Sequence, residues 1–99
     1  MKIFYHSTSF KNLTEIVDKG IECRNIEKLV YLCEKSEDCL KFAYMHGCKD
    51  ILVLKVKVDE SDIVETFDHS ENFFKCRCFA SIKPILPKSI IEYMRYTLD

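Results

Sequence analysis

The chain has 99 residues and nearly balanced charge, with 15 Lys and Arg against 16 Asp and Glu. This length suffices for one hydrophobic core and predicts a single domain over residues 1–99. The net charge of -1 argues against general nucleic-acid binding, which uses a strongly basic surface. The sequence contains no apolar run of membrane-spanning length and no signal-peptide pattern, so we expect a cytoplasmic protein without a membrane partner.

Six cysteines are many for a chain of this length, yet none forms the paired C-x-x-C spacing of a zinc knuckle. Cys33, Cys39 and Cys48 stand where small apolar residues would also fit. Since free cysteines are often buried, we expect mostly reduced, structural thiols and no metal site.

The first third of the chain predicts a strand followed by a helix. Residues 2–6 alternate as a strand does, and the hydroxyls of Ser7, Thr8 and Ser9 are typical of a helix N-cap. Apolar residues from Phe10 to Val17 recur at helical spacing, and Gly20 follows where a helix C-cap is expected.

The remaining pattern predicts further short strands and one more helix. We expect strands over residues 29–33, 50–58, 63–64 and 73–82, and a helix from Ser36 to Gly47. Residues 89–98 fit both a strand and a helix, and their β-branched and aromatic residues favour the strand. The fold class is therefore predicted to be α+β, with small mixed or antiparallel sheets and two helices.

The tripeptide His6-Ser7-Thr8 is the first candidate binding site. An imidazole and two hydroxyls at the end of a strand can donate to and accept from ribose hydroxyls or a phosphate, and amides of the next helix would suit an anion. The alternative, which the local pattern alone favours, is a helix N-cap beside a surface histidine.

Tyr31 is the second candidate, because it interrupts an otherwise aliphatic strand. Its ring could stack on a planar heterocycle while its hydroxyl stays at the wet edge. The alternative is a core tyrosine whose hydroxyl bonds to the backbone.

The segment Asp68-His69-Ser70-Glu71 places two acids and an imidazole within four residues. Glu71 could orient a sugar hydroxyl, and His69 could transfer a proton near neutral pH. The alternative is an ordinary polar loop.

The order of these elements resembles the ADP-ribosyltransferase-like fold. The similarity is carried by Phe4 to Thr8, Lys19-Gly20-Ile21, Val30-Tyr31-Leu32, the strand at 51–54 and the turn at 85–87 running into 89–91. Its motifs are short and cover most of the chain. The chain looks most similar to small bacterial or phage-like members of this fold, and more distantly to its RNA 2'-phosphotransferase and DNA-modifying branches.

The resemblance implies NAD as the cofactor. It gives His6 the place of the histidine that binds the NAD ribose, with Ser7 and Thr8 beside it, and Tyr31 the place of the aromatic residue that stacks on nicotinamide. The family usually has a glutamate on a late strand, but residues 73–80 contain no acid. Glu71, just before that strand, is the candidate for this role, with His69 assisting.

These observations leave three hypotheses. The first is NAD-dependent transfer of ADP-ribose to a protein or nucleic acid, with Tyr31, His69 and Glu71 as the catalytic group. The second is a catalytically inactive binding module, or a small inhibitor or regulator of a protein partner, that keeps the fold and binds NAD or a related nucleotide. The third is phosphate transfer from an RNA end to NAD, which needs several basic residues around the pocket.

Overall fold

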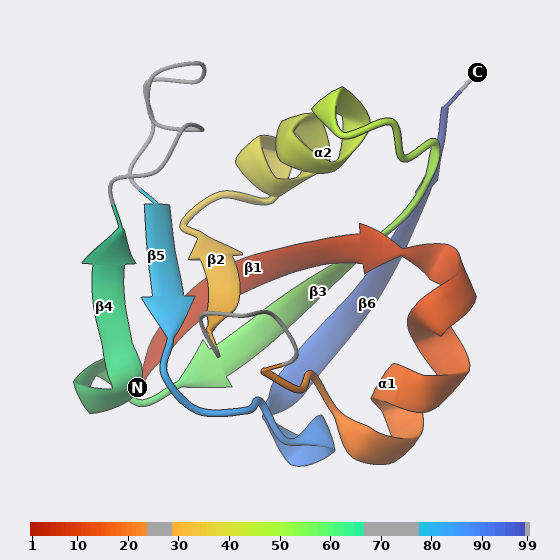
Figure 1. The fold of residues 1–99 in the computed structure, drawn as a ribbon. Helices are drawn as coiled ribbons and strands as arrows, with labels where there is room; N and C mark the ends of the chain where they lie inside the picture. Colours follow the sequence, from red (N-terminus) through yellow and green to blue (C-terminus); the bar gives the residue numbers. More distant parts are fainter. Residues whose placement is uncertain (24–28, 67–77, 99) are drawn as a thin grey trace.

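The computed structural model describes residues 1–23, 29–66 and 78–98. Its elements, in chain order, are β1 (Lys2–Ser9), a 3-10 turn (Phe10–Asn12), α1 (Leu13–Lys19), β2 (Val30–Cys33), α2 (Ser36–Met45), β3 (Asp50–Val58), a 3-10 turn (Glu60–Asp62), β4 (Ile63–Thr66), β5 (Cys78–Ser81), a 3-10 turn (Pro87–Ser89) and β6 (Ile90–Thr97) (Figure 1). Among the described residues, no helix is long and apolar enough to span a membrane.

The six strands form one sheet in the order β4-β5-β2-β1-β3-β6, and every neighbouring pair is antiparallel. The predicted α+β class with two helices is confirmed, as a single antiparallel sheet rather than several small or mixed ones. β1 pairs with β3 along its whole length, from Lys2 opposite Val58 to Ser9 opposite Ile51. By contrast, β1 and β2 share one paired position, Tyr5 opposite Cys33, so these two strands diverge on either side of it.

The first half of β3, Ile51 to Leu54, is buried on both faces because a helix packs against each, whereas Lys57 near its end is exposed. The β3 residues Leu52, Leu54, Val56 and Val58 belong to the larger core cluster, together with Phe4 of β1 and Ile16 of α1. The alternate residues Ile51 and Val53 pack with Cys39 and Ala43 of α2 in a second cluster. Since side chains alternate along a strand, α1 and α2 lie on opposite faces of the sheet.

The end of β1 corrects one prediction. Ser7, Thr8 and Ser9 do not cap a helix: they continue β1 opposite Val53, Leu52 and Ile51 of β3, and Ser9 makes no side-chain cap bond. Pairing with a fully buried strand satisfies their backbone groups, and this tertiary contact outweighs the local N-cap preference. The helical residues begin at Phe10, as the apolar spacing predicted, but in a 3-10 turn, and the α-helix α1 begins at Leu13.

The other boundaries follow the sequence pattern closely. The strand predicted over residues 50–58 is confirmed in full, and the 89–98 segment is the strand β6. Of the strand predicted over 73–82, the structure describes residues 78–82 and assigns Cys78–Ser81 to β5. Gly20 ends α1 with a positive φ of 80° and donates its N–H to the Ile16 carbonyl, as a C-cap glycine does.

Candidate functional site

His6 lies where β1 and β2 begin to diverge. Its Nδ1 atom is 2.8 Å from the backbone carbonyl oxygen of Tyr31 on β2. Because a carbonyl only accepts hydrogen bonds, Nδ1 donates and carries the ring proton. The neutral ring then keeps Nε2 as an acceptor for a further hydrogen bond.

Burial sets the protonation state of this imidazole. His6 is only partly exposed, and its desolvation by the surrounding protein lowers the pKa of His6 from 6.5 to about 4. His6 is therefore neutral at physiological pH, with Nδ1–H donating to the Tyr31 carbonyl and Nε2 remaining as an acceptor.

The lowered pKa predicts that the protein loses stability in mild acid. Below pH 6.5 the unfolded chain protonates His6 while the folded chain does not, so the stability that the neutral ring contributes falls as the pH drops towards 4. The loss between pH 7 and pH 5 is expected to be about 2 kcal/mol. Urea unfolding at the two pH values measures it for the wild type and for His6→Gln, which should lose much of this difference.

The exposed His46 provides the matched control for this experiment. Its Nδ1 bonds to the Phe42 carbonyl at 2.8 Å within one helical turn. His46→Gln removes an imidazole that lies away from β1 and leaves the bond between His6 and Tyr31 intact, so comparing the two variants separates the effect of His6 from that of losing a histidine elsewhere. If His6→Gln had the same pH dependence of stability as the wild type, the lowered pKa assigned to His6 would be contradicted.

A cavity of about 160 Å³ opens beside His6 on the side of the sheet that α1 covers. Its lining residues come from β1, the turn after it, α1 and the segment behind Gly20: His6, Thr8, Asn12, Glu15, Ile16, Gly20, Ile21 and Glu22. Asn12 Nδ2 donates to Thr8 Oγ1 at 2.9 Å, so the Thr8 hydroxyl can turn its own proton towards a ligand. The lining combines polar and apolar groups and contains two carboxylates, Glu15 and Glu22.

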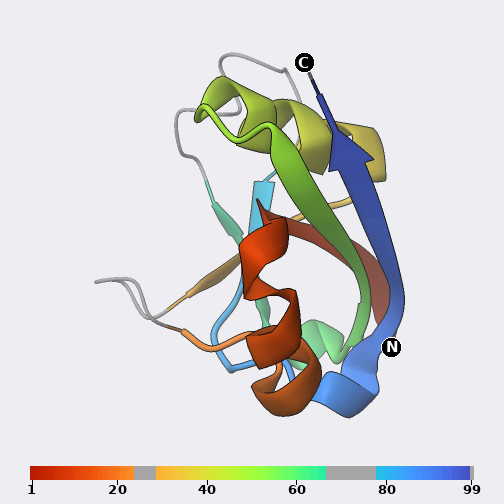
Figure 2. The same ribbon diagram turned by 90° about the vertical axis from the view of Figure 1, so that its right-hand side faces the viewer.

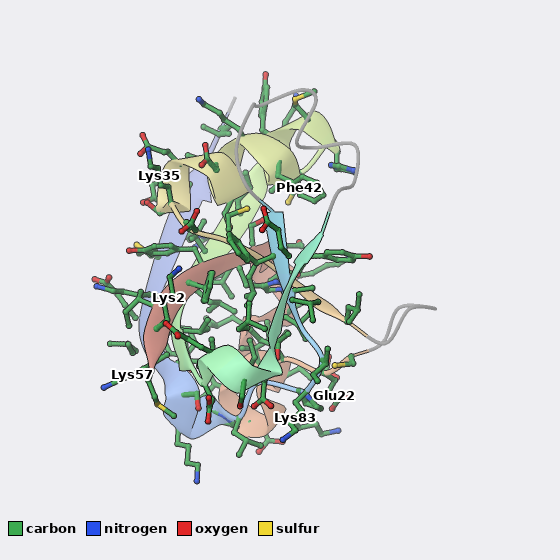
Figure 3. All side chains as sticks on the ribbon, turned by 90° about the vertical axis from the view of Figure 1, so that its left-hand side faces the viewer. Lys2, Glu22, Lys35, Phe42, Lys57 and Lys83 are labelled. Atoms are coloured by element: carbon green, nitrogen blue, oxygen red, sulfur yellow. The ribbon has the colours of Figure 1, made fainter. Side chains whose placement is uncertain are left out.

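The cavity lies away from the α2 end of the molecule. Figure 3 shows Glu22 at the end opposite the α2 residue Phe42. Behind the cavity, Ile21 and Ile85 form a two-bond antiparallel bridge, with N–H to carbonyl distances of 2.8 Å in both directions. This bridge fixes the backbone on which Gly20, Ile21 and Glu22 line the site.

Only part of the predicted site is brought together here. His6 and Thr8 share one face of β1 and line the cavity, whereas Ser7 points to the opposite face, opposite Val53 of the α2 cluster. Tyr31 contacts His6 through its backbone carbonyl and is not among the cavity residues.

The Tyr31 side chain leaves β2 in a different direction from the imidazole. It alternates with the buried Val30 and Leu32, which belong to the same core cluster as Phe4, and Phe4 shares its face of β1 with His6. His6 and Tyr31, to which the resemblance gives the ribose and the nicotinamide of NAD, therefore do not both line this cavity. His69 and Glu71 lie outside the described residues, and their catalytic roles stay predictions.

Three polar lining residues were missed by the sequence reasoning: Asn12, Glu15 and Glu22. The spacing of Asn12 and Glu15 carried a usable signal, because with Ile16 they follow the i, i+3, i+4 pattern of one helix face. No signal in the sequence pointed to Glu22, since its position depends on the bridge between Ile21 and Ile85.

Comparison with known proteins adds no identification, because neither a protein-family model nor a curated protein matches this sequence. Within residues 1–23, 29–66 and 78–98, no three histidine, cysteine or acidic side chains are grouped as metal ligands. The four cysteines whose thiols the structure describes, Cys23, Cys33, Cys39 and Cys48, form no disulfide. Cys39 is buried and donates its thiol to the Tyr5 carbonyl at 3.1 Å, which agrees with a packing role.

Proposed function

We propose that this chain binds a nucleotide through its ribose in the cavity beside His6, and that NAD or a close relative is the ligand. The observation that carries the proposal is the neutral His6 ring, fixed by its bond to the Tyr31 carbonyl, in the same cavity as the Thr8 hydroxyl. A fixed acceptor next to a hydroxyl suits the adjacent hydroxyl groups of a ribose. The ADP-ribosyltransferase-like resemblance, which gives His6 this role, supports the same ligand.

Charge favours a hydroxyl-bearing group over a phosphate at this position. The lining contains the carboxylates of Glu15 and Glu22 and no Lys or Arg, and His6 is neutral, so these residues offer no cation to an anionic phosphate. A sugar hydroxyl carries no charge and can donate as well as accept. The phosphates of a dinucleotide would therefore remain outside the cavity.

The size of the cavity leads to the same conclusion. Sites that enclose drug-sized ligands have volumes of roughly 300–1,000 Å³. At about 160 Å³ this cavity takes one sugar-sized group and leaves the rest of a dinucleotide on the surface. The ribose is thus the part of the ligand that the described residues recognise.

Of the hypotheses from the sequence, the geometry favours a binding module over an active transferase. Transfer of ADP-ribose needs a stacked nicotinamide and a carboxylate near its ribose, and the Tyr31 phenol points away from the cavity. Transfer by Tyr31, His69 and Glu71 remains the second candidate, supported by the family resemblance. The third hypothesis, phosphate transfer from an RNA end, finds acids rather than bases in the cavity lining.

Thermal unfolding in the presence of NAD tests the proposal. A ligand at one hundred times its Kd stabilises the folded state by about 2.7 kcal/mol. For a domain of this size we expect the Tm to rise on the order of 10–20 °C. Thr8→Val removes one ligand hydrogen bond and is expected to weaken binding up to about tenfold, measured by calorimetric titration.

Two variants of the same two strands serve as controls. Ser7→Ala, on the opposite face of β1, and Tyr31→Phe, which keeps the backbone carbonyl, are expected to bind NAD as the wild type does. A Tm that does not change at any NAD concentration would contradict nucleotide binding. Release of nicotinamide during incubation, abolished by Tyr31→Ala, would instead support the transferase.

A further inference from the structure

The sheet ends in a long strand that has a neighbour on one side only. β6 pairs with β3 and closes the strand order of the described residues, and Figures 1 and 2 show it at the outer rim. It has eight residues, whereas the strand at the other edge, β4, has four. Such an edge presents a row of backbone N–H and carbonyl groups on which another strand can pair.

The side chains of β6 suit a protein partner better than water. Ile91 is 51% exposed and Tyr93 is 39% exposed, and neither has a described element beyond it. The Arg95 side chain is held in a fixed position, because its guanidinium makes two hydrogen bonds to the Asp50 carboxylate, at 2.9 and 3.0 Å. The same guanidinium lies 3.7 Å from the centre of the Phe10 ring, which fixes it against the sheet.

We propose that β6 pairs with β6 of a second copy of this chain, antiparallel and about a twofold axis at Met94. A twofold axis perpendicular to the sheet keeps each residue on its own face, so paired residues must be separated by an even number of positions. The register shift between Lys55 and Val56 leaves Ile91 without a partner on β3, as in a β-bulge, and the regular part of β6 begins at Glu92. The even separation of paired residues and the start of the regular strand at Glu92 together allow few registers.

The chemistry of the pairs selects Met94 among them. An axis at Arg95 would place two arginines directly opposite each other, which is unfavourable, and an axis at Tyr93 would set Arg95 opposite the bulged Ile91. An axis at Met94 instead pairs the regular residues Glu92 to Tyr96 with one another. An axis at Met94 pairs Tyr93 with the second copy's Arg95 and Glu92 with the second copy's Tyr96. The Tyr93 ring can then stack on the guanidinium face of a cation that is already held in place.

A groove on the α2 face adds charge complementarity to this register. It has a volume of about 360 Å³ and is lined by Leu40, Lys41, Tyr44 and Leu98, next to the end of β6. The second copy's Glu92 would lie opposite Tyr96, on the same face of the sheet as this groove and two residues from Leu98. The carboxylate thus approaches the side of the molecule that carries the Lys41 ammonium group.

Cysteine cross-linking distinguishes this register from the others. Met94→Cys places two thiols directly opposite each other on the axis, at a Cα separation that a disulfide can bridge. With oxidised glutathione, each cross-link transfers two electrons to one glutathione disulfide and releases two glutathione thiols. We expect a covalent dimer joined at position 94, identified by mass spectrometry of the linked peptide so that native cysteines are not confused with it. Tyr93→Cys, the matched control, is expected to cross-link much less, because its opposite residue is Arg95.

Sedimentation equilibrium of the unmodified chain and two charge variants tests the association itself. The wild type is expected to dimerise reversibly as its concentration rises. Tyr93→Lys sets a cation against the second copy's Arg95 and is expected to weaken dimerisation at least tenfold. Val17→Lys, on an exposed site of α1, should leave it unchanged.

Three results would overturn the proposal. The first is a wild type that remains monomeric at every soluble concentration. The second is preferential cross-linking through Tyr93→Cys rather than Met94→Cys. The third is a monomer whose β6 amides are protected from hydrogen exchange by an added extended peptide, because the edge would then pair with a different protein strand. Circular dichroism of each variant confirms that a lost dimer is not a lost fold.

Discussion

Gly20→Ala is expected to lower the free energy of unfolding by about 2–6 kcal/mol. At φ 80° and ψ -159°, Gly20 occupies a backbone region that is essentially restricted to glycine, which costs another residue roughly 1–3 kcal/mol. A Cβ atom here would also lie 2.1 Å from the Ile85 carbonyl oxygen and 2.9 Å from Pro87 Cδ. Relieving that overlap adds roughly 1–3 kcal/mol. Chemical denaturation with circular dichroism measures the loss.

The overlap falls on the bridge that closes the back of the cavity. The Ile85 oxygen that a Cβ would meet accepts the hydrogen bond from the Ile21 N–H. Moving this oxygen weakens the bridge, so Gly20→Ala is also expected to reduce NAD binding in whatever fraction remains folded.

Gly47→Ala is the matched control, because Gly47 also has a positive φ, 85°, but nothing lies within 4 Å of its would-be Cβ. The strain alone should cost about 1 kcal/mol. Equal losses in the two variants would show that the close approach to Ile85 contributes nothing.

Phe4→Ala is expected to destabilise the protein by about 3–5 kcal/mol. Phe4 is 1% exposed at the centre of the larger core cluster, and its ring lies 5.2 Å from the ring of Phe79 on β5. It therefore connects two parts of the sheet that share few backbone bonds. Since domains of this size have stabilities of about 5–15 kcal/mol, this loss would populate the unfolded state measurably, as a urea titration would show.

Two further substitutions test whether burial is the cause. Phe4→Leu keeps most of the buried surface and is expected to cost less than about 2 kcal/mol. Val17→Ala, at a site 53% exposed on α1, should change stability by no more than about 0.5 kcal/mol. If Phe4→Ala were as mild as Val17→Ala, the core assignment would be wrong.

The parts of the fold that the sequence predicted well are those determined by local pattern. The alternation of residues 50–58 and the glycine after α1 each have one physical reading, and the structure has both. The segment Ser7 to Ser9 had two physical readings, because hydroxyl residues occur both at helix N-caps and in edge or central strands. Pairing with β3, more than forty residues later, decided between them.

The candidate site shows the same division. His6 and Thr8 could be selected from the sequence because an imidazole and a hydroxyl two residues apart on a strand share a face. The direction of the Tyr31 side chain could not be predicted from the sequence, since it depends on which face of β2 the core covers. Glu22 depends on a contact with Ile85 that lies more than sixty residues away.

The single paired position between β1 and β2 has a mechanical consequence. The sheet consists of two three-stranded halves, β4-β5-β2 and β1-β3-β6, and the Tyr5–Cys33 pair with the imidazole beside it is the seam between them. Few hydrogen bonds need to break for the halves to rotate against each other. Amides along this seam should exchange with deuterium sooner than those between β1 and β3, and a sugar bound against His6 should slow them.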